Sequence, residues 1–209
     1  MVTSSIRRTH RPWRVVAALA LAAATLAAAV QPVATHAAAR PAAPAPFDRQ
    51  FIDMMVPHHQ GATAMAQVAL ARAQHPQIKR LAQAIIADQN KEIAQMKTWR
   101  KAWYGSATTP DMDHMPMLPG MPMDMTHSMM DMTGQVSRLK MAKPFDRAFI
   151  DAMTPHHQMA VAAAKLELAR GAHQQLKDLA LAIIEGQSRE LGLMQAYRDI
   201  WYGNAGMGM

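Results

Sequence analysis

Two pairs of adjacent histidines are the residues of this chain best suited to bind a transition metal. His58 and His59 lie in the motif Phe-Asp-Arg-x-Phe-Ile-Asp-x-Met-x-Pro-His-His-Gln, which recurs once with His156 and His157. Neutral imidazole is a ligand for zinc, copper, iron and nickel. The recurrence of the pair in one sequence context indicates that the same chemistry is present twice.

The motif belongs to a longer internal repeat, with residues 47–105 matching residues 145–203 without a gap. About 32 of the 59 aligned positions are identical, and many of these are side chains that bind metals. Such self-similarity at a fixed distance indicates a duplicated structural unit. The candidate ligands common to both copies are Met55, His58, His59, Gln89, Glu92 and Met96, matched by Met153, His156, His157, Gln187, Glu190 and Met194.

The spacing of apolar residues predicts four helices and no strands. Each repeat carries apolar residues three and four positions apart, with a break at His75-Pro76 in the first copy. We expect helices over about 47–74, 76–104, 145–170 and 174–202. A single two-helix hairpin exposes its apolar stripe, so the predicted fold is all-α, with two hairpins paired into a ferritin-like four-helix bundle. The alternative is pairing with a hairpin of another chain, as in a homodimer.

Antiparallel geometry brings together the polar residues that the two repeats share. With the turn near residues 73–75, facing positions sum to about 148, which places Gln89 and Glu92 opposite His58. A buried carboxylate is costly unless it is paired, hydrogen-bonded or bound to a metal. Pro57 precedes the histidines and would either kink the helix toward a common centre or start a new helix at its first turn.

The segment between the repeats, within a linker over residues 106–144, has an unusual density of methionine. Residues 111–134 combine nine methionines with two histidines, aspartates and prolines, which predicts a flexible loop. Thioether sulfur is a soft, neutral ligand that selects Cu(I), and by the same argument Ag(I). An adaptable hydrophobic docking surface is the competing interpretation. The candidate ligands are Met112, His114, Met115, Met117, Met121, Met123, Met125, His127, Met129, Met130 and Met132.

The N-terminal residues read as an export signal. Four arginines precede an uncharged run from Val15 to Val30, so we expect a signal peptide over residues 1–39 and a Pro/Ala leader over residues 40–46. An uncleaved membrane anchor is the alternative, although the run is short for a membrane span. Cleavage would lower the formal charge from +7 to +3. The mature chain is then nearly neutral, which argues against nucleic-acid binding. We expect no stable membrane insertion once the signal peptide is removed.

The chain contains no cysteine, which restricts how it can bind soft metals. An exported protein without cysteine has no disulfides and must be stabilised by its apolar core. Any soft-metal site must then be built from methionine and histidine. Residues 204–209 form a short tail after the second repeat.

The two motifs resemble the CopM-like family, formerly catalogued as a domain of unknown function and related to ferritin-like four-helix proteins. The resemblance covers both repeats and is carried by Met-x-Pro-His-His-Gln at 55–60 and 153–158, followed by Gln-x-x-Glu at 89–92 and 187–190. It implies an exported copper-binding protein associated with copper tolerance, with ligands at Met55, His58, His59, Met96 and their repeat partners. Position 61 is glycine in the first copy and Met159 in the second, so the two sites can differ in their ligands.

The leading hypothesis is a protein without enzymatic turnover that sequesters, buffers or transfers Cu(I) and Cu(II), and also binds Ag(I), in the periplasm. Its expected partners are metal ions and a periplasmic copper chaperone or efflux component. A ferritin-like metal-dependent oxidase is the second hypothesis, although Gln95 and Leu193 stand where such enzymes place the histidine of Glu-x-x-His. A helical interaction module whose histidines are only structural is the third.

Overall fold

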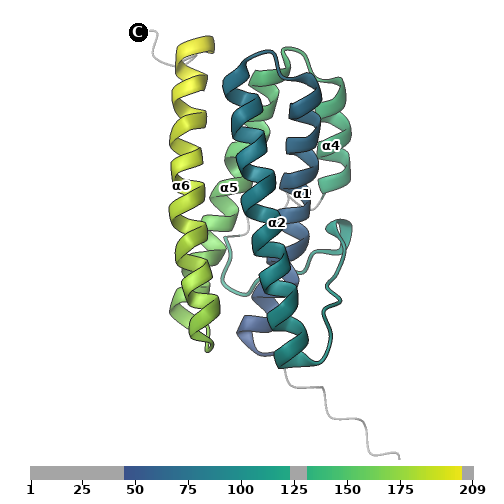
Figure 1. Cartoon of the computed structure of the whole chain (residues 1–209), viewed down its shortest axis with the longest axis vertical. Helices are drawn as coiled ribbons and strands as arrows, with labels where there is room; N and C mark the ends of the chain where they lie inside the picture. The colour runs from purple at the N-terminus through teal and green to yellow at the C-terminus, as the bar shows by residue number, and fades with distance from the viewer. Residues whose placement is uncertain (1–44, 123–130, 204–209) are drawn as a thin grey trace, which may run out of the picture. The chain divides into compact units, whose positions relative to one another are not determined.

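The computed structural model describes residues 45–122 and 131–203, and all regular structure in these ranges is helical. This confirms the predicted all-α class. The structure adds a helix that the sequence pattern did not predict, within the linker (Figure 1). The elements are α1 (Phe47–Arg72), α2 (Pro76–Tyr104), the short 3-10 helix η1 (Met112–His114), α4 (Met132–Met141), α5 (Phe145–Arg170) and α6 (Gln174–Tyr202).

The ends of the long helices follow local signals in the sequence. Pro76 occupies the first turn of α2, where its missing N–H has no helical partner to lose. Gly105 ends the same helix with φ +80°, a left-handed conformation that glycine adopts without steric cost. Helix α1 runs continuously through Pro57, so the interpretation that this proline starts a new helix is wrong.

The two repeats pair with each other inside one chain. Helix α1 packs along α2 and α5 packs along α6, and the two hairpins meet mainly through α1 and α5. Helices α2 and α6 touch each other only slightly. The alternative in which each hairpin needs a hairpin from a second chain is therefore not required to cover the apolar stripes.

The first aspartate of each repeat fixes the antiparallel pairing of α1 with α5. The carboxylate of Asp48, at the start of α1, accepts hydrogen bonds from the backbone N–H groups of Ala172 (2.7 Å) and His173 (2.8 Å), just beyond α5. Asp146, at the start of α5, accepts from the backbone N–H of His75 at 2.8 Å. Burial alone would raise the pKa of Asp48, but these hydrogen bonds outweigh burial and lower it.

Each hairpin turn is also held by an aromatic residue of the other repeat. The ring of His173 stacks on Trp103 of α2, with 3.7 Å between centroids, and His75 stacks on Trp201 of α6 at 3.8 Å. The same two histidines bond to Asp48 and Asp146 through Nδ1. The turns therefore connect the repeats as well as the helices of one hairpin.

The apolar interior forms two separate clusters, one toward each end of the helices. One cluster contains Met55 and Met96 together with apolar residues from the end of α5 and the start of α6. The other contains Met153 and Met194 together with residues from the end of α1 and the start of α2. The buried histidines of α1 and α5 belong to neither cluster.

The described part of the linker is packed on the bundle, which differs from the predicted flexible loop. Met115, Leu118 and Met121 are buried in the first apolar cluster. Helix α4 lies along α1, and Arg72 of α1 donates to the carbonyl oxygens of Leu139 (3.1 Å) and Ala142 (3.2 Å). The sequence pattern missed this because burial of the linker depends on contacts with α1 that are distant in sequence.

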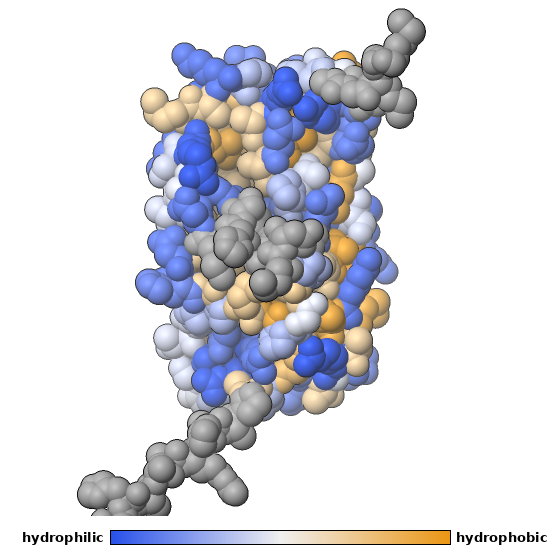
Figure 2. Space-filling model, turned by 180° about the vertical axis from the view of Figure 1, so that it is seen from behind, coloured by the Kyte–Doolittle hydropathy of each residue, from blue (hydrophilic) through white to orange (hydrophobic). Residues whose placement is uncertain are grey.

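Several predictions concern residues outside the described ranges. These are the signal peptide over 1–39, most of the Pro/Ala leader, the tail at 204–209, and the candidate ligands Met123, Met125, His127, Met129 and Met130. Within the described ranges, none of the helices combines the length and apolar character that a membrane span requires. Viewed from behind, the surface intersperses apolar patches among hydrophilic side chains (Figure 2).

A buried carboxyl group at one end of the bundle should make stability depend on pH. Glu167 of α5 is fully buried, and burial, followed by the charge of Asp48, raises its pKa from 4.5 to about 8. Between these two values the folded state holds a proton that the unfolded state has lost, so stability falls as pH rises from about 4.5 to 8. The corresponding residue of the first repeat is Ala69, which cannot titrate.

We therefore expect Glu167→Gln to reduce the loss of stability between pH 6 and pH 9 by up to roughly 3 kcal/mol, because the amide has no proton to release. Urea denaturation followed by circular dichroism at the two pH values measures this difference. Glu167→Ala, which copies the first repeat, should flatten the same dependence even if its cavity lowers stability at both pH values. An unchanged pH dependence in both variants would contradict the assignment.

Candidate metal site

The centre of the bundle is a contact between one histidine of each repeat. His58 of α1 faces His156 of α5 with 3.7 Å between ring centroids and an interplanar angle of 37°. Both side chains are fully buried. None of their four ring nitrogens makes a hydrogen bond with the described part of the protein. Four buried lone pairs or N–H groups without partners thus meet where α1 crosses α5.

Burial keeps both central imidazoles neutral. Loss of solvation lowers the pKa of His58 and of His156 well below 6.5, and the neighbouring histidines lower it further. A weaker contribution from the backbone of the opposite histidine acts in the other direction. Neutral imidazole is the form that binds metals, so the pair is already in the required protonation state at neutral pH.

The second histidine of each pair is bound to the glutamate of its own hairpin. His59 Nε2 lies 2.7 Å from Glu92 Oε2, and His157 Nε2 lies 2.6 Å from Glu190 Oε2. An ionised carboxylate only accepts, so Nε2 donates, and in a neutral ring Nδ1 then carries the lone pair. Each Nδ1 is buried and unpartnered. Glutamates in this arrangement orient a metal-binding histidine.

The predicted approach of the glutamate to the histidine pair is therefore observed, although the contact is with His59 and not with His58. Gln89 and Gln187 are also buried, and both atoms of each side-chain amide lack a hydrogen bond in the described structure. Metal ligation by Glu92, Glu190 and these two glutamines stays a prediction. The four repeat methionines, Met55, Met96, Met153 and Met194, lie in the apolar clusters above and below the histidines.

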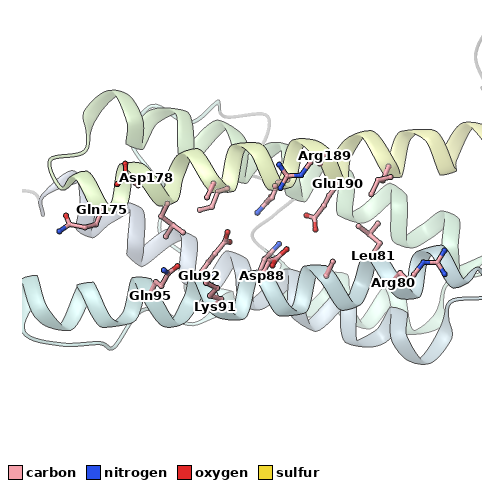
Figure 3. A pocket seen from close by; sticks show the side chains of 18 of the residues that line it. Arg80, Leu81, Asp88, Lys91, Glu92, Gln95, Gln175, Asp178, Arg189 and Glu190 are labelled. Carbon is pink, nitrogen blue, oxygen red and sulfur yellow. The ribbon is translucent and has the colours of Figure 1, made fainter.

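A groove of about 920 Å³ opens between α2 and α6, where the two hairpins hardly touch. Its wall includes both glutamates and both buried glutamines. In Figure 3, Glu92 and Glu190 point from the two opposite helices into the space between them. The groove therefore leads from solvent to the two carboxylates that bond to His59 and His157.

The described linker residues are distributed between the core and the surface. Met115, Met121 and Met132 are buried, Met112 packs at the edge of the core, and Met117 is exposed. His114 is exposed and its Nδ1 bonds to Asp111 at 2.7 Å. Across the described ranges, no three histidine or acidic side chains converge as in a hard-metal centre.

Sequence reasoning missed the contact between His58 and His156. The pairing rule within one hairpin relates α1 to α2 and says nothing of α1 against α5. The available signal was the aspartate at the start of each repeat, since Asp48 and Asp146 anchor the opposite turns and thereby fix the crossing point. Asp53 and Asp151 of the motif have a structural role, because each bonds to an arginine of its own hairpin, at 2.5 Å and 2.8 Å.

Residues 48–198 match the family described as a domain of unknown function, DUF305. The chain belongs to the DUF305 family. It is similar to CopM in its Cu(I)-bound form, with 38% identity, 75% of this chain and 98% of that chain covered, and a TM-score of 0.62. CopM is also known in Cu(II)-bound and Ag-bound forms. The resemblance to the CopM-like family that the motifs indicated is thus confirmed.

Other DUF305 proteins share the fold at lower identity. A fragment from Deinococcus radiodurans is 28% identical over 73% of this chain and 95% of that chain, with a TM-score of 0.58. A protein from Streptomyces coelicolor, described as a predicted secreted protein, is 27% identical over 73% and 91%, with a TM-score of 0.59. In sequence alone, the chain is also similar to the uncharacterized protein L153 of Acanthamoeba polyphaga mimivirus, with 39% identity over 51 residues, which cover 24% of this chain and only 34% of that relative.

The central histidines should lower the stability of the metal-free DUF305 bundle. A buried polar group without a partner costs about 1–3 kcal/mol, whereas an apolar pair of similar volume costs nothing of this kind. We expect His58→Leu combined with His156→Leu to raise the free energy of unfolding of the metal-free protein by about 1–3 kcal/mol. Urea denaturation at pH 7, after treatment with a chelator, measures the change.

The same double variant should gain more at acidic pH. The folded pKa of each histidine is lowered, so below pH 6.5 the unfolded state binds protons that the folded state does not, and wild-type stability falls. The leucine pair removes this loss, so the difference from wild type should widen between pH 7 and pH 5. A double variant that is less stable than wild type at both pH values would show that the histidines stabilise the apo fold.

Proposed function

We propose that this DUF305 protein binds Cu(I) at the bundle centre and acts in copper sequestration, buffering or transfer without catalytic turnover. The observation that carries the proposal is the contact between His58 and His156, whose ring nitrogens are buried, neutral and unpartnered. A bound ion would supply a partner for one nitrogen of each ring. The similarity to CopM, which has been seen with Cu(I), Cu(II) and Ag, supports copper and silver as the ions.

The outer histidines offer a second kind of site. His59 and Glu92, and likewise His157 and Glu190, place imidazole beside carboxylate next to the solvent-open groove. Nitrogen and oxygen ligands suit Cu(II), whereas the buried centre has no carboxylate of its own. We propose that Cu(II) binds at the outer pairs and that the groove is the route by which an ion enters or leaves.

Export to the periplasm fits this role, and we propose that residues 1–39 are removed there as a signal peptide. The ferritin-like bundle would provide the defined sites, and the methionines of the linker that are not buried would capture further ions weakly. A copper chaperone or efflux component is the expected recipient. The groove between α2 and α6 is the surface through which such a partner would reach the histidines.

A metal-dependent oxidase is the alternative from another functional class. Its chemistry needs several carboxylates around two metal ions, with glutamates of four helices projecting inward. Glu92 and Glu190 instead bond to the histidines of their own hairpins at the groove. Oxygen uptake with Cu(I) or Fe(II) separates this alternative from binding alone, and metal analysis separates both from a helical interaction module.

The proposal predicts that the mature chain competes with a Cu(I) chelator of micromolar affinity and also binds Ag(I). It should ignore Mg²⁺ and Ca²⁺, because imidazole and thioether are poor ligands for hard cations. Spectrophotometric competition titration under anaerobic conditions measures the affinity. Failure of the mature chain to compete would refute the proposed function.

The central contact further predicts that the two repeats do not provide independent Cu(I) sites at His58 and His156. His58→Ala alone and His156→Ala alone should each lower Cu(I) affinity at the first equivalent as much as the double variant does, because the ion needs both rings. His114→Ala, which removes an exposed histidine, is the matched control and should keep that affinity. Additive losses from the two single variants would indicate two separate sites, one in each repeat.

A further inference from the structure

Met132, which the sequence places in the linker, lies at the histidine centre of the bundle. A Cβ atom added to Gly61 would stand 2.8 Å from the Met132 sulfur and 3.5 Å from His156 Nε2. The thioether and an unpartnered imidazole nitrogen therefore border the same small volume beside α1. Met132 is buried, with 1% of its surface exposed, so its sulfur is not an exposed capture group.

We propose that Met132 supplies the thioether ligand of the Cu(I) site shared by His58 and His156. This inference rests on the proposed function and adds to it a specific residue from outside the repeats. Met132 is then part of the defined Cu(I) site and is not one of the linker methionines that capture ions weakly. The linker then has two parts, a segment that completes the bundle site and a remainder that does not.

The difference between the repeats at position 61 supports this assignment. Gly61 in α1 corresponds to Met159 in α5, although the four preceding residues, Pro-His-His-Gln, are identical in the two copies. Met159 is buried, so the second repeat places its own thioether two residues after its histidine pair. In the first repeat the space beside Gly61 is filled by Met132. Each repeat thus has one buried methionine at this place. In the second repeat it is Met159 of α5 itself, and in the first repeat it is Met132, which comes from α4.

Helix α4, which carries Met132 in its first turn, is capped at its N-terminal end and attached to α1 at its C-terminal end. Asp131 caps the helix by accepting from the backbone N–H of Gly134 at 2.8 Å, and Arg138 pairs with the same carboxylate at 2.8 Å. At the other end, Arg72 of α1 bonds to the last carbonyl oxygens of α4. The Met132 side chain is therefore delivered by a helix that is attached to α1 and not by a free loop.

Two imidazoles and one thioether form a neutral ligand set. Neutral ligands of this softness suit the single charge of Cu(I) or Ag(I), and the carboxylates that would favour harder cations are bound to the outer histidines. A thioether also binds without losing a proton. Met132 should therefore increase affinity and selectivity for Cu(I) at the centre and leave Cu(II) binding at the outer pairs unaffected.

The test compares Met132→Leu with Met65→Leu in the full mature chain. Both substitutions replace a buried methionine by leucine, a swap that cores usually tolerate. Met132 lies in the first apolar cluster and borders the same small volume as His156 Nε2, whereas Met65 lies in the second apolar cluster. We expect Met132→Leu to lower Cu(I) affinity at the first equivalent by at least about tenfold and to reduce the sulfur scattering seen by X-ray absorption. Met65→Leu should retain both the affinity and the sulfur signal.

Gly61→Ala is a second variant that leaves the sulfur in the protein. Its new Cβ would meet the Met132 sulfur at 2.8 Å and displace it, while alanine favours helix over glycine. We expect the same loss of Cu(I) affinity with helicity unchanged by circular dichroism. Wild-type Cu(I) affinity in either folded variant would overturn the role of Met132. If His58→Ala loses Cu(I) affinity in the same experiment, the proposed function would still stand. A wild-type chain that fails to compete for Cu(I) would instead refute the proposed function itself.

Discussion

The antiparallel crossing of α1 and α5 at His58 and His156 is the constraint on which the rest of the structure depends. The crossing places two imidazoles in contact at a depth where no described hydrogen-bond partner is available. Buried polar groups of this kind divide the interior, so the apolar residues form one cluster on each side. A bundle built only for stability would place leucine or isoleucine here. This unfavourable burial is the observation on which the proposed metal site rests.

The pairing of the repeats also explains residues of the motif that do not belong to the site. Asp48 and Asp146 bond to the turns of the opposite hairpins, and Trp103 and Trp201 stack on the histidines of those turns. These contacts are reciprocal, so they hold α1 and α5 in one register. A shift of that register would separate His58 from His156. Part of the motif thus forms the proposed metal site, and part sets the geometry of that site.

The helices and the hairpin partners could be predicted from sequence because both depend on local signals. Helical spacing, Pro76 and Gly105 define α2, and the antiparallel rule brings Glu92 to the histidine pair. The central contact and the burial of Met132 could not be predicted, because they depend on how separate hairpins and the linker pack. Composition alone assigned every linker methionine to one role, whereas Met115 and Met121 are core residues. Local pattern carries no information on these distant contacts.

The positions at which the repeats differ show how a duplicated fold becomes asymmetric. The first repeat has Gly61 where the second has Met159, which leaves space for a linker residue on α1 only. The second repeat has Glu167 where the first has Ala69, which puts a titratable group at one end of the bundle only. The shared histidines keep the centre nearly two-fold symmetric. Because α4 lies along α1, Gly61 removes the side chain that would otherwise exclude Met132. The asymmetry therefore follows from the position of the linker, which places the Met132 sulfur beside His156 Nε2 and Gly61 of α1.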